Sequence, residues 1–339
     1  MNTNKSTWQL FRRGAISGLA RPPAFTRSAF TAASFGVLVL MASLVGCGPG
    51  RPGPTPSSPP QAAVEEHVLT LGQGELFARR TAPPDPVASL LVLHGGPGMS
   101  SGYLLDLEQL ASMGIEVIAF DQRGSGASGR PDARWTLAAY HADVEAVVDA
   151  LATAPLHLFG HSWGGLLAMT YAANHPEQVE SLVLFGSAPP TRDALQRADA
   201  SFQERVAELR QADVIGPPPE DPEDYLAWVL PSYFHDPGFA PPGALANQPI
   251  QPQVNRATWQ ALGAFDSRQE LSGLGLPILF FYGESDPFGR SMAEASLEAL
   301  ETAQIEVVWL TGCGHFWHEC PLQVLPRVAG FLRQQSAVP

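Results

Sequence analysis

The chain has 339 residues, of which 45% are hydrophobic and 16% charged, a balance that excludes an intrinsically disordered protein and provides for a sizeable core. Its 33 acidic residues outnumber the 20 basic ones, for a formal net charge of −13. A surface this acidic repels phosphate backbones, so we expect no nucleic-acid partner. Three cysteines are too few for a disulfide framework or a cysteine-rich zinc site.

The first 46 residues have the pattern of an export signal, with five basic residues, no acidic one, and a charge-free apolar run from position 28. The run ends in Leu44-Val45-Gly46-Cys47, which resembles the lipobox of bacterial lipoproteins. That resemblance implies cleavage before Cys47 and attachment of lipid to its thiol. We therefore expect residues 1–46 to be a lipoprotein signal peptide. The mature protein would then be lipid-anchored in the cell envelope, on a bacterial membrane facing the periplasm or the exterior.

Other interpretations of this segment remain open. It could be an uncleaved membrane anchor or the signal of a plainly secreted protein, but its apolar centre, residues 35–46, is shorter than the roughly 20 residues that span a bilayer. The pair Arg12-Arg13 is compatible with twin-arginine export, although the neighbouring residues match that signal poorly.

Residues 47–63 are rich in proline, glycine and serine and show no apolar periodicity. Such a composition predicts an extended, semi-rigid tether rather than a packed element. The folded body therefore begins near Val64.

From Val64 onward, short β-type runs alternate with helical patterns, which predicts an α/β fold with a mostly parallel central sheet flanked by helices. Two of the runs, at residues 89–94 and 116–121, are apolar enough for strands buried on both faces. Thr136 is a candidate N-cap for a helix that extends to Leu151. The predicted strands span residues 67–71, 75–80, 89–94, 116–121, 156–160, 181–185, 278–282 and 307–310.

The alternation stops between residues 187 and 272, where polar helical patterns and proline clusters replace it. A segment of this length is too long for a structureless loop. We interpret it as a helical cap inserted into a core formed by residues 64–186 and 273–339.

A candidate nucleophile lies in Gly160-His161-Ser162-Trp163-Gly164, which fits G-x-S-x-G after a predicted strand and before a predicted helix. At such a turn the backbone is strained, and the flanking glycines avoid collisions with the neighbouring strand and helix. The turn exposes the Ser162 hydroxyl and directs the helix N-terminus toward it, which favours negative charge near the N–H of Trp163.

A serine nucleophile needs a base that is oriented by an acid, and in α/β hydrolases the chain order is serine, acid, histidine. Asp286 follows the strand at 278–282, and His315 follows the strand at 307–310. Because parallel strands end at one sheet edge, both side chains are expected near Ser162. Glu284 is the alternative acid and His318 the alternative base.

The second oxyanion donor is expected in His94-Gly95-Gly96-Pro97-Gly98, which opens the loop after the strand at 89–94. Pro97 has no N–H, so we assign the role to Gly96, with Gly95 as the alternative. Glycine allows the backbone to approach a substrate oxygen closely. The oxyanion hole would then consist of the N–H groups of Gly96 and Trp163.

Taken together, HGGPG, DQRGSG (residues 121–126), GHSWGG, GESDP (residues 283–287) and GCGH (residues 312–315) resemble the motif series of the proline iminopeptidase branch of the α/β hydrolases. The resemblance implies an α/β-hydrolase fold with Ser162 as nucleophile, Asp286 as acid and His315 as base. It also implies that the DQRGSG loop lines the site, where Asp121 and Arg123 have either a structural or a substrate-binding role.

Proline iminopeptidases hold the substrate's amine with glutamates of the cap, near a tryptophan-rich helix motif. This sequence departs from the family there, because its cap contains no clear copy of that motif. None of the acidic cap residues is assigned to this role. They are Glu204, Glu208, Glu220, Glu223 and Asp224.

The leading functional hypothesis is a serine hydrolase that releases N-terminal proline or small apolar residues from short peptides through an acyl-enzyme. The alternative is a carboxylesterase or lactonase that acts on small esters with the same triad, and a third interpretation is a catalytically idle binding protein. We expect no cofactor and no metal, because the nine histidines are scattered and form no H-E-x-x-H pattern. The expected partners are a small-molecule or short-peptide substrate and, through the N-terminal lipid, a membrane.

The two remaining cysteines, Cys313 and Cys320, flank the proposed base. Outside the cytoplasm a disulfide between them is permitted, and it would close a short loop over His315. Two buried free thiols are the commoner fate of cysteine, and we favour them slightly. A bridge requires Cα atoms within roughly 7 Å of each other.

Overall fold

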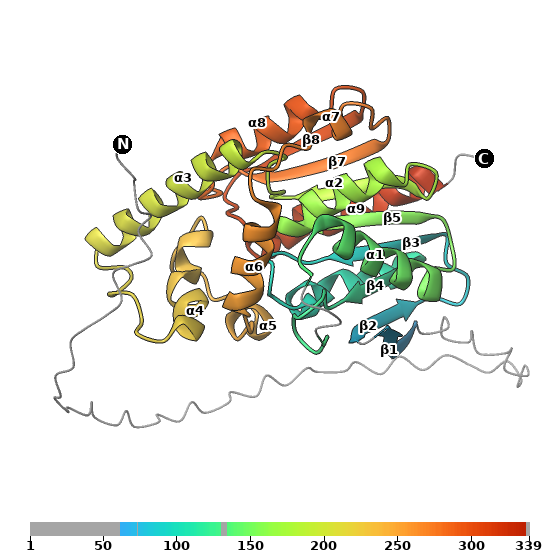
Figure 1. Cartoon of the computed structure of the whole chain (residues 1–339), viewed down its shortest axis with the longest axis horizontal. Helices are drawn as coiled ribbons and strands as arrows, with labels where there is room; N and C mark the ends of the chain where they lie inside the picture. Colours follow the sequence, from blue (N-terminus) through green and yellow to red (C-terminus); the bar gives the residue numbers. More distant parts are fainter. Residues whose placement is uncertain (1–61, 73, 130–133, 337–339) are drawn as a thin grey trace, which may run out of the picture. The chain divides into compact units, whose positions relative to one another are not determined.

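The computed structural model describes residues 62–72, 74–129 and 134–336. The predicted signal peptide, Cys47 and nearly all of the predicted tether lie outside the described residues. The body is built on an eight-stranded sheet in the order β1-β2-β4-β3-β5-β6-β7-β8 (Figure 1). Strands β3 to β8 pair in parallel, and β2 pairs antiparallel with both β1 and β4. The strands are β1 (Ala63–Leu71), β2 (Gly74–Ala82), β3 (Ala88–Leu93), β4 (Ile115–Phe120), β5 (Leu156–His161), β6 (Val179–Phe185), β7 (Pro277–Gly283) and β8 (Gln304–Leu310).

The predicted strands are all present, with ends that coincide or shift by at most four residues. Every residue of β3, β4 and β5 is buried, as their continuous apolar runs predict for strands covered on both faces. Successive side chains point to opposite faces, so Leu158 joins one hydrophobic core cluster and Phe159 the other. The sheet therefore separates two cores.

Helices cover both faces of this sheet (Figure 1). On one face pack α1 (Leu137–Leu151), α2 (Trp163–Asn174) and α8 (Arg290–Ala299). On the other face pack the 3₁₀ helix η1 (Ser101–Met113) and the C-terminal α9 (Pro321–Ser336). Thr136 caps α1 as predicted, because its side chain accepts a hydrogen bond from the N–H of Ala139 at 3.3 Å. None of the described helices combines the length and the apolar character needed to cross a bilayer.

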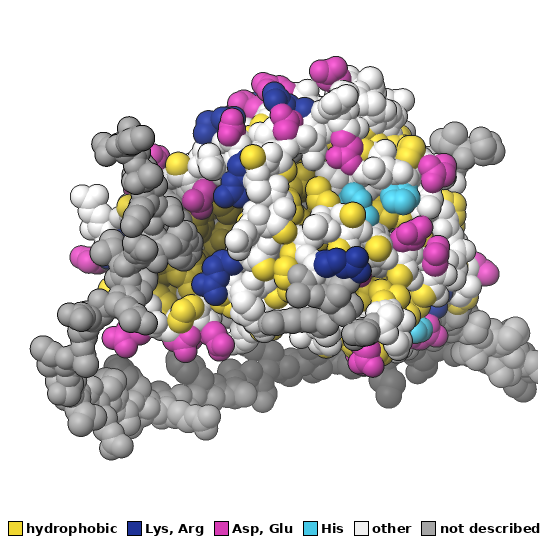
Figure 2. Space-filling model, in the orientation of Figure 1, with side chains coloured by type: hydrophobic (Ala, Val, Ile, Leu, Met, Phe, Trp, Pro, Cys, Tyr) yellow, Lys and Arg dark blue, Asp and Glu magenta, His cyan; other side chains and the backbone are white. Residues whose placement is uncertain are grey.

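Between β6 and β7 the described chain forms helices, as predicted; those within residues 192–262 gather at one end of the sheet, whereas the short helix at residues 268–271 packs against α2 (Figure 1). The cap meets the carboxyl ends of the strands, since the N–H of Gln251 donates to the carbonyl of Gly98 in the loop after β3. Figure 2 shows that the surface is hollowed beside α6 and that hydrophobic side chains lie inside the hollow. The cap helices are α3 (Arg192–Gln211), η2 (Pro222–Asp224), α4 (Tyr225–Val229), η3 (Leu230–Tyr233), α5 (Gly243–Ala246), α6 (Pro252–Leu262) and α7 (Arg268–Leu271).

Candidate active site

Ser162 lies at the sharp turn between β5 and α2, with φ 54° and ψ −120°. A positive φ is uncommon for a residue with a side chain, and such strain persists where the surroundings hold it. A Cβ at Gly160 would lie 2.5 Å from the carbonyl oxygen of Gly164, and a Cβ at Gly164 would overlap the carbonyl oxygen of Leu93. The strand, the turn and the helix thus approach as closely as the two glycines allow, which is the arrangement that G-x-S-x-G predicts.

Asp286 and His315 are in contact at the same edge of the sheet. His315 Nδ1 lies 2.7 Å from Asp286 Oδ2, and both residues are buried, with exposures of 2% and 6%. Asp286 lies in the loop after β7, and its other oxygen accepts the N–H of Phe288 at 3.0 Å. Because a carboxylate accepts and does not donate, Nδ1 carries the proton and Nε2 keeps its lone pair. His315 therefore has the tautomer that a general base requires.

The alternative acid and base occupy other environments. Glu284 is exposed. His318 is buried too, but its Nε2 lies 3.1 Å from the carbonyl oxygen of Tyr103, and burial lowers its pKa. Asp286 is bonded to His315 rather than to His318.

The loop after β3 passes close to Ser162, since a Cβ at Gly95 would lie 3.1 Å from Ser162 Cβ. The N–H of Gly95 donates to the hydroxyl of Tyr103 at 2.8 Å, so it is already engaged. Among the described residues, the N–H of Gly96 has no acceptor. Gly96 adopts φ 121°, and Asn255 of the cap donates to its carbonyl at 2.9 Å. This geometry favours Gly96 over Gly95 as an oxyanion donor. Trp163 offers a second N–H, because the first residue of a helix has no intrahelical acceptor.

A buried hydrogen-bond chain joins this loop to the loop of His315. His161 Nε2 lies 2.9 Å from the carbonyl oxygen of His315, so Nε2 must donate and Nδ1 must accept. Nδ1 lies 2.7 Å from the Tyr103 hydroxyl, which donates to it and accepts from Gly95. Burial lowers the pKa of His161 well below its usual value and keeps the ring neutral. No local sequence pattern indicates this series of hydrogen bonds, because Tyr103 and His161 are 58 positions apart.

The DQRGSG loop supports the site through buried polar contacts. Asp121 accepts the N–H and the hydroxyl of Ser101 at 2.7 and 2.8 Å. Arg123 pairs with Asp143 of α1 at 2.7 Å, and both side chains are about 5% exposed. Gln122 accepts the indole N–H of Trp163 at 2.8 Å. The contacts of Asp121 and Arg123 support the structural alternative that the sequence left open.

A cavity of about 430 Å³ lies between α3 and the loop after β7. Two of the acidic cap residues, Glu204 and Glu208, line it, and Asp286 forms part of its wall; Ser162 and His315 are not among its lining residues. Arg205 also lines it and forms an ion pair with Glu208 at 3.7 Å. The full lining is Ser201, Glu204, Arg205, Glu208, His235, Ser285, Asp286 and Pro287.

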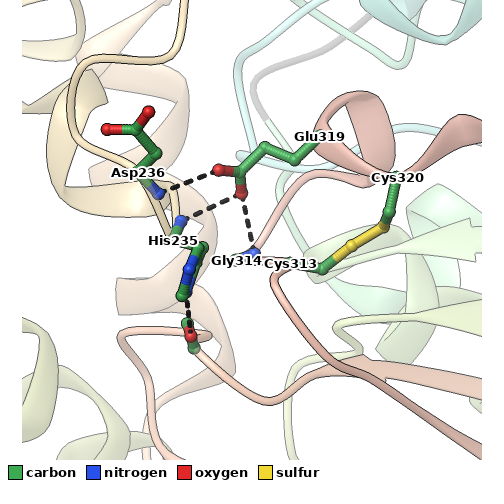
Figure 3. Close-up of a disulfide and its surroundings, with 7 residues drawn as sticks. His235, Asp236, Cys313, Gly314, Glu319 and Cys320 are labelled. Carbon is green, nitrogen blue, oxygen red and sulfur yellow. Dashed lines mark hydrogen bonds between the residues drawn. A yellow bond between two sulfur atoms is a disulfide. The ribbon is translucent and has the colours of Figure 1, made fainter.

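Cys313 and Cys320 form a disulfide (Figure 3), and their Cα atoms lie 6.1 Å apart. The slight preference for two free thiols was therefore wrong. The loop between them returns on itself through η4 (Trp317–Glu319), which brings the two cysteines within bridging distance. Both free and disulfide-bonded cysteines are usually buried, so the sequence alone could not distinguish the two states.

The comparisons with known proteins agree with this architecture. The family described as alpha/beta hydrolase fold matches residues 88–319. Proline iminopeptidase of Lactobacillus delbrueckii subsp. bulgaricus is 38% identical over 277 residues, which cover 74% of this chain and 92% of that protein. Proline iminopeptidase of Thermoplasma volcanium is 28% identical over 251 residues, or 67% of this chain and 82% of the relative. The crystal structure of proline iminopeptidase from Mycobacterium smegmatis has the same fold, with a TM-score of 0.65 at 24% identity over 80% of this chain and 99% of that one. The chain belongs to the α/β-hydrolase family, as a hydrolase with proline iminopeptidases among its relatives.

Proposed function

We propose that the protein is a serine hydrolase in which Ser162, His315 and Asp286 form a catalytic triad. The observation that carries this proposal is the buried 2.7 Å contact between His315 Nδ1 and Asp286 Oδ2, at the sheet edge where Ser162 occupies a strained turn. In this scheme His315 Nε2 removes the proton of the Ser162 hydroxyl as Oγ attacks the substrate carbonyl carbon. Asp286 stabilises the imidazolium that forms.

The attack converts the carbonyl oxygen into an oxyanion, which the N–H groups of Gly96 and Trp163 stabilise. His315 then gives its proton to the leaving nitrogen or oxygen, and the bond to that atom breaks. The resulting acyl-enzyme ester is hydrolysed by water, whose proton passes to His315 and back to Ser162 Oγ.

For the substrate, we propose short peptides from which an N-terminal proline or small apolar residue is released. The proline iminopeptidases among the relatives support this class. The cavity beside Asp286 supports it too, because Glu204 and Glu208 supply carboxylates that would bind a free, positively charged amine. The ion pair of Glu208 with Arg205 leaves Glu204 as the better candidate for this contact.

The test is a comparison of kcat/KM for the anilides of proline, alanine and leucine with that for short p-nitrophenyl esters. An aminopeptidase should cleave the anilides with a free amine and lose that activity when the amine is acetylated, because the ammonium charge is then absent. Cleavage of esters alone would identify a carboxylesterase or lactonase. Failure of a fluorophosphonate probe to label the protein would contradict both enzymes and favour a binding protein.

We further propose that Cys47 becomes the lipidated N-terminus, on the basis of its lipobox-like sequence after an apolar run. In a bacterial host, Cys47→Ser should remove the lipid mass from the N-terminal peptide and release the protein from the membrane fraction, since the acylated thiol is then absent. Mass spectrometry of the N-terminal peptide and membrane fractionation measure the two effects. Retention of Cys47→Ser in membranes would favour an uncleaved anchor.

A further inference from the structure

The side chain of Glu319 joins two segments of backbone that are far apart in the sequence. Its carboxylate accepts three backbone N–H groups, from Gly314 and His235 at 2.9 Å and from Asp236 at 3.0 Å. His235 and Asp236 belong to the cap, two and three residues after the end of η3, whereas Gly314 immediately precedes the proposed base (Figure 3). One carboxylate therefore links the cap to the loop of His315.

This loop is held at both of its ends. The disulfide between Cys313 and Cys320 closes it, and Glu319 lies next to the second cysteine. The loop also touches the cap directly, because the N–H of His315 donates to the carbonyl of Tyr233 at 2.7 Å. A Cβ at Gly314 would overlap that same carbonyl oxygen. The backbone of Gly314 and His315 is thus bonded both to the Glu319 carboxylate, through Gly314, and to the cap, through His315.

A carboxylate suits this position for an electrostatic reason. Hydrogen bonds to an ionised acceptor are shorter and about twice as strong as neutral ones. The two carboxylate oxygens share the three donors, with Gly314 and His235 on Oε2 and Asp236 on Oε1. Without the side chain, these N–H groups would lose their acceptor, and the loop would keep the hydrogen bond of His315 to Tyr233 but lose the carboxylate link to the cap.

We propose that Glu319 is a positioning residue for His315: it fixes the backbone before the base and so keeps the imidazole aligned with Asp286 and Ser162. This inference rests on the proposed function of the triad. A misplacement of a reacting group by about 1 Å costs up to about 10²-fold in rate, so an effect on kcat is expected although Glu319 touches no substrate. Glu319 itself does not line the cavity, and its bond to the cavity residue His235 is made by the backbone N–H rather than the side chain, so KM should change less than kcat.

Glu319→Ala removes all three bonds, and we expect it to lower kcat by about 10- to 100-fold while KM changes by less than about threefold. The rate of fluorophosphonate labelling of Ser162 should fall in parallel, because that reaction also needs the base. Kinetics with p-nitrophenyl butyrate and with the best anilide, together with labelling rates, measure these effects on the full chain.

Two further variants make the experiment specific. Glu319→Gln keeps one carbonyl oxygen, which can accept from both Gly314 and His235, so kcat should stay within about threefold of the wild type. Asp236→Asn is the matched control, because the Asp236 side chain points away from Glu319 in Figure 3 while its backbone N–H remains in place. It should leave kcat and labelling unchanged. If Glu319→Ala does not fold, Glu319→Asp replaces it, since that side chain keeps the charge but is one methylene too short to reach the donors.

A variant without the three bonds that labels at the wild-type rate and shows a raised KM would overturn the proposal, because Glu319 would then only shape the cap. The Ser162→Ala variant separates this failure from that of the triad. If Ser162→Ala abolishes labelling and turnover while Glu319→Ala leaves both intact, the positioning role alone is wrong. Turnover that survives in Ser162→Ala contradicts the proposed function itself.

Discussion

Replacing Ser162 with alanine should lower kcat by on the order of 10⁴-fold or more, and replacing His315 with alanine should cost about as much. In the proposed triad both side chains act in one proton transfer, so the loss of either would remove the same step. The double variant should therefore lose little beyond either single one. What activity remains would come from substrate binding and from the N–H groups of Gly96 and Trp163, which neither substitution removes.

Steady-state kinetics of the two single variants and the double variant, on whichever substrate the wild type cleaves best, measure this non-additivity. Ser112→Ala is a suitable control, because this hydroxyl is exposed and bonds only to a carbonyl of its own helix, that of Gln109 at 2.7 Å. It should retain wild-type kcat. Losses that multiply in the double variant would show that Ser162 and His315 act independently and would contradict the triad.

The strands and the turn that surround the site could be predicted from the sequence, because apolar runs and glycine spacing within one short segment determine them. The strands that carry Ser162 and Asp286 are apolar runs buried on both faces, and burial of such runs is the main driving force for a parallel sheet. The nucleophile turn was equally predictable, because glycines at positions 160 and 164 are required by contacts within one strand-turn-helix unit. Motif order then placed Asp286 and His315 at neighbouring strand ends, where they are in contact.

The contacts that tune the site could not be predicted, because each one joins segments that are distant in the chain and leaves no periodic pattern. No pattern in the sequence distinguishes Tyr103, yet its hydroxyl accepts the N–H of Gly95 and so leaves the N–H of Gly96 as the candidate oxyanion donor. No local pattern distinguishes Glu319 either, yet its carboxylate accepts N–H groups from both the cap and the loop of His315. Long-range polar contacts of this kind depend on the completed fold rather than on local sequence.

The close approach of α2 to β3 gives the site its geometry. A methyl group at position 164 would overlap the carbonyl oxygen of Leu93 and lie 2.7 Å from that of His94. Both obstacles are backbone atoms, which cannot rotate away as a flexible side chain can. The helix or the loop after β3 would have to move, and these two segments carry the N–H groups of Trp163 and Gly96.

We therefore expect Gly164→Ala to lower the free energy of unfolding by about 1–3 kcal/mol, the usual range for overpacking a buried site. It should also lower kcat by about 10²-fold or more, because displacing one proposed oxyanion donor has a cost of that order.

Gly330→Ala is the matched control: Gly330 is exposed within α9, and a Cβ there would meet nothing within 4 Å. Since alanine has the higher helix propensity, this change should raise stability by up to about 1 kcal/mol and leave kcat unchanged. Urea denaturation of both variants measures the change in unfolding free energy, and steady-state kinetics measure the change in kcat. If Gly164→Ala were as stable and as active as Gly330→Ala, α2 could not pack against β3 as closely as the structure has it, and the placement of the two oxyanion donors would be wrong.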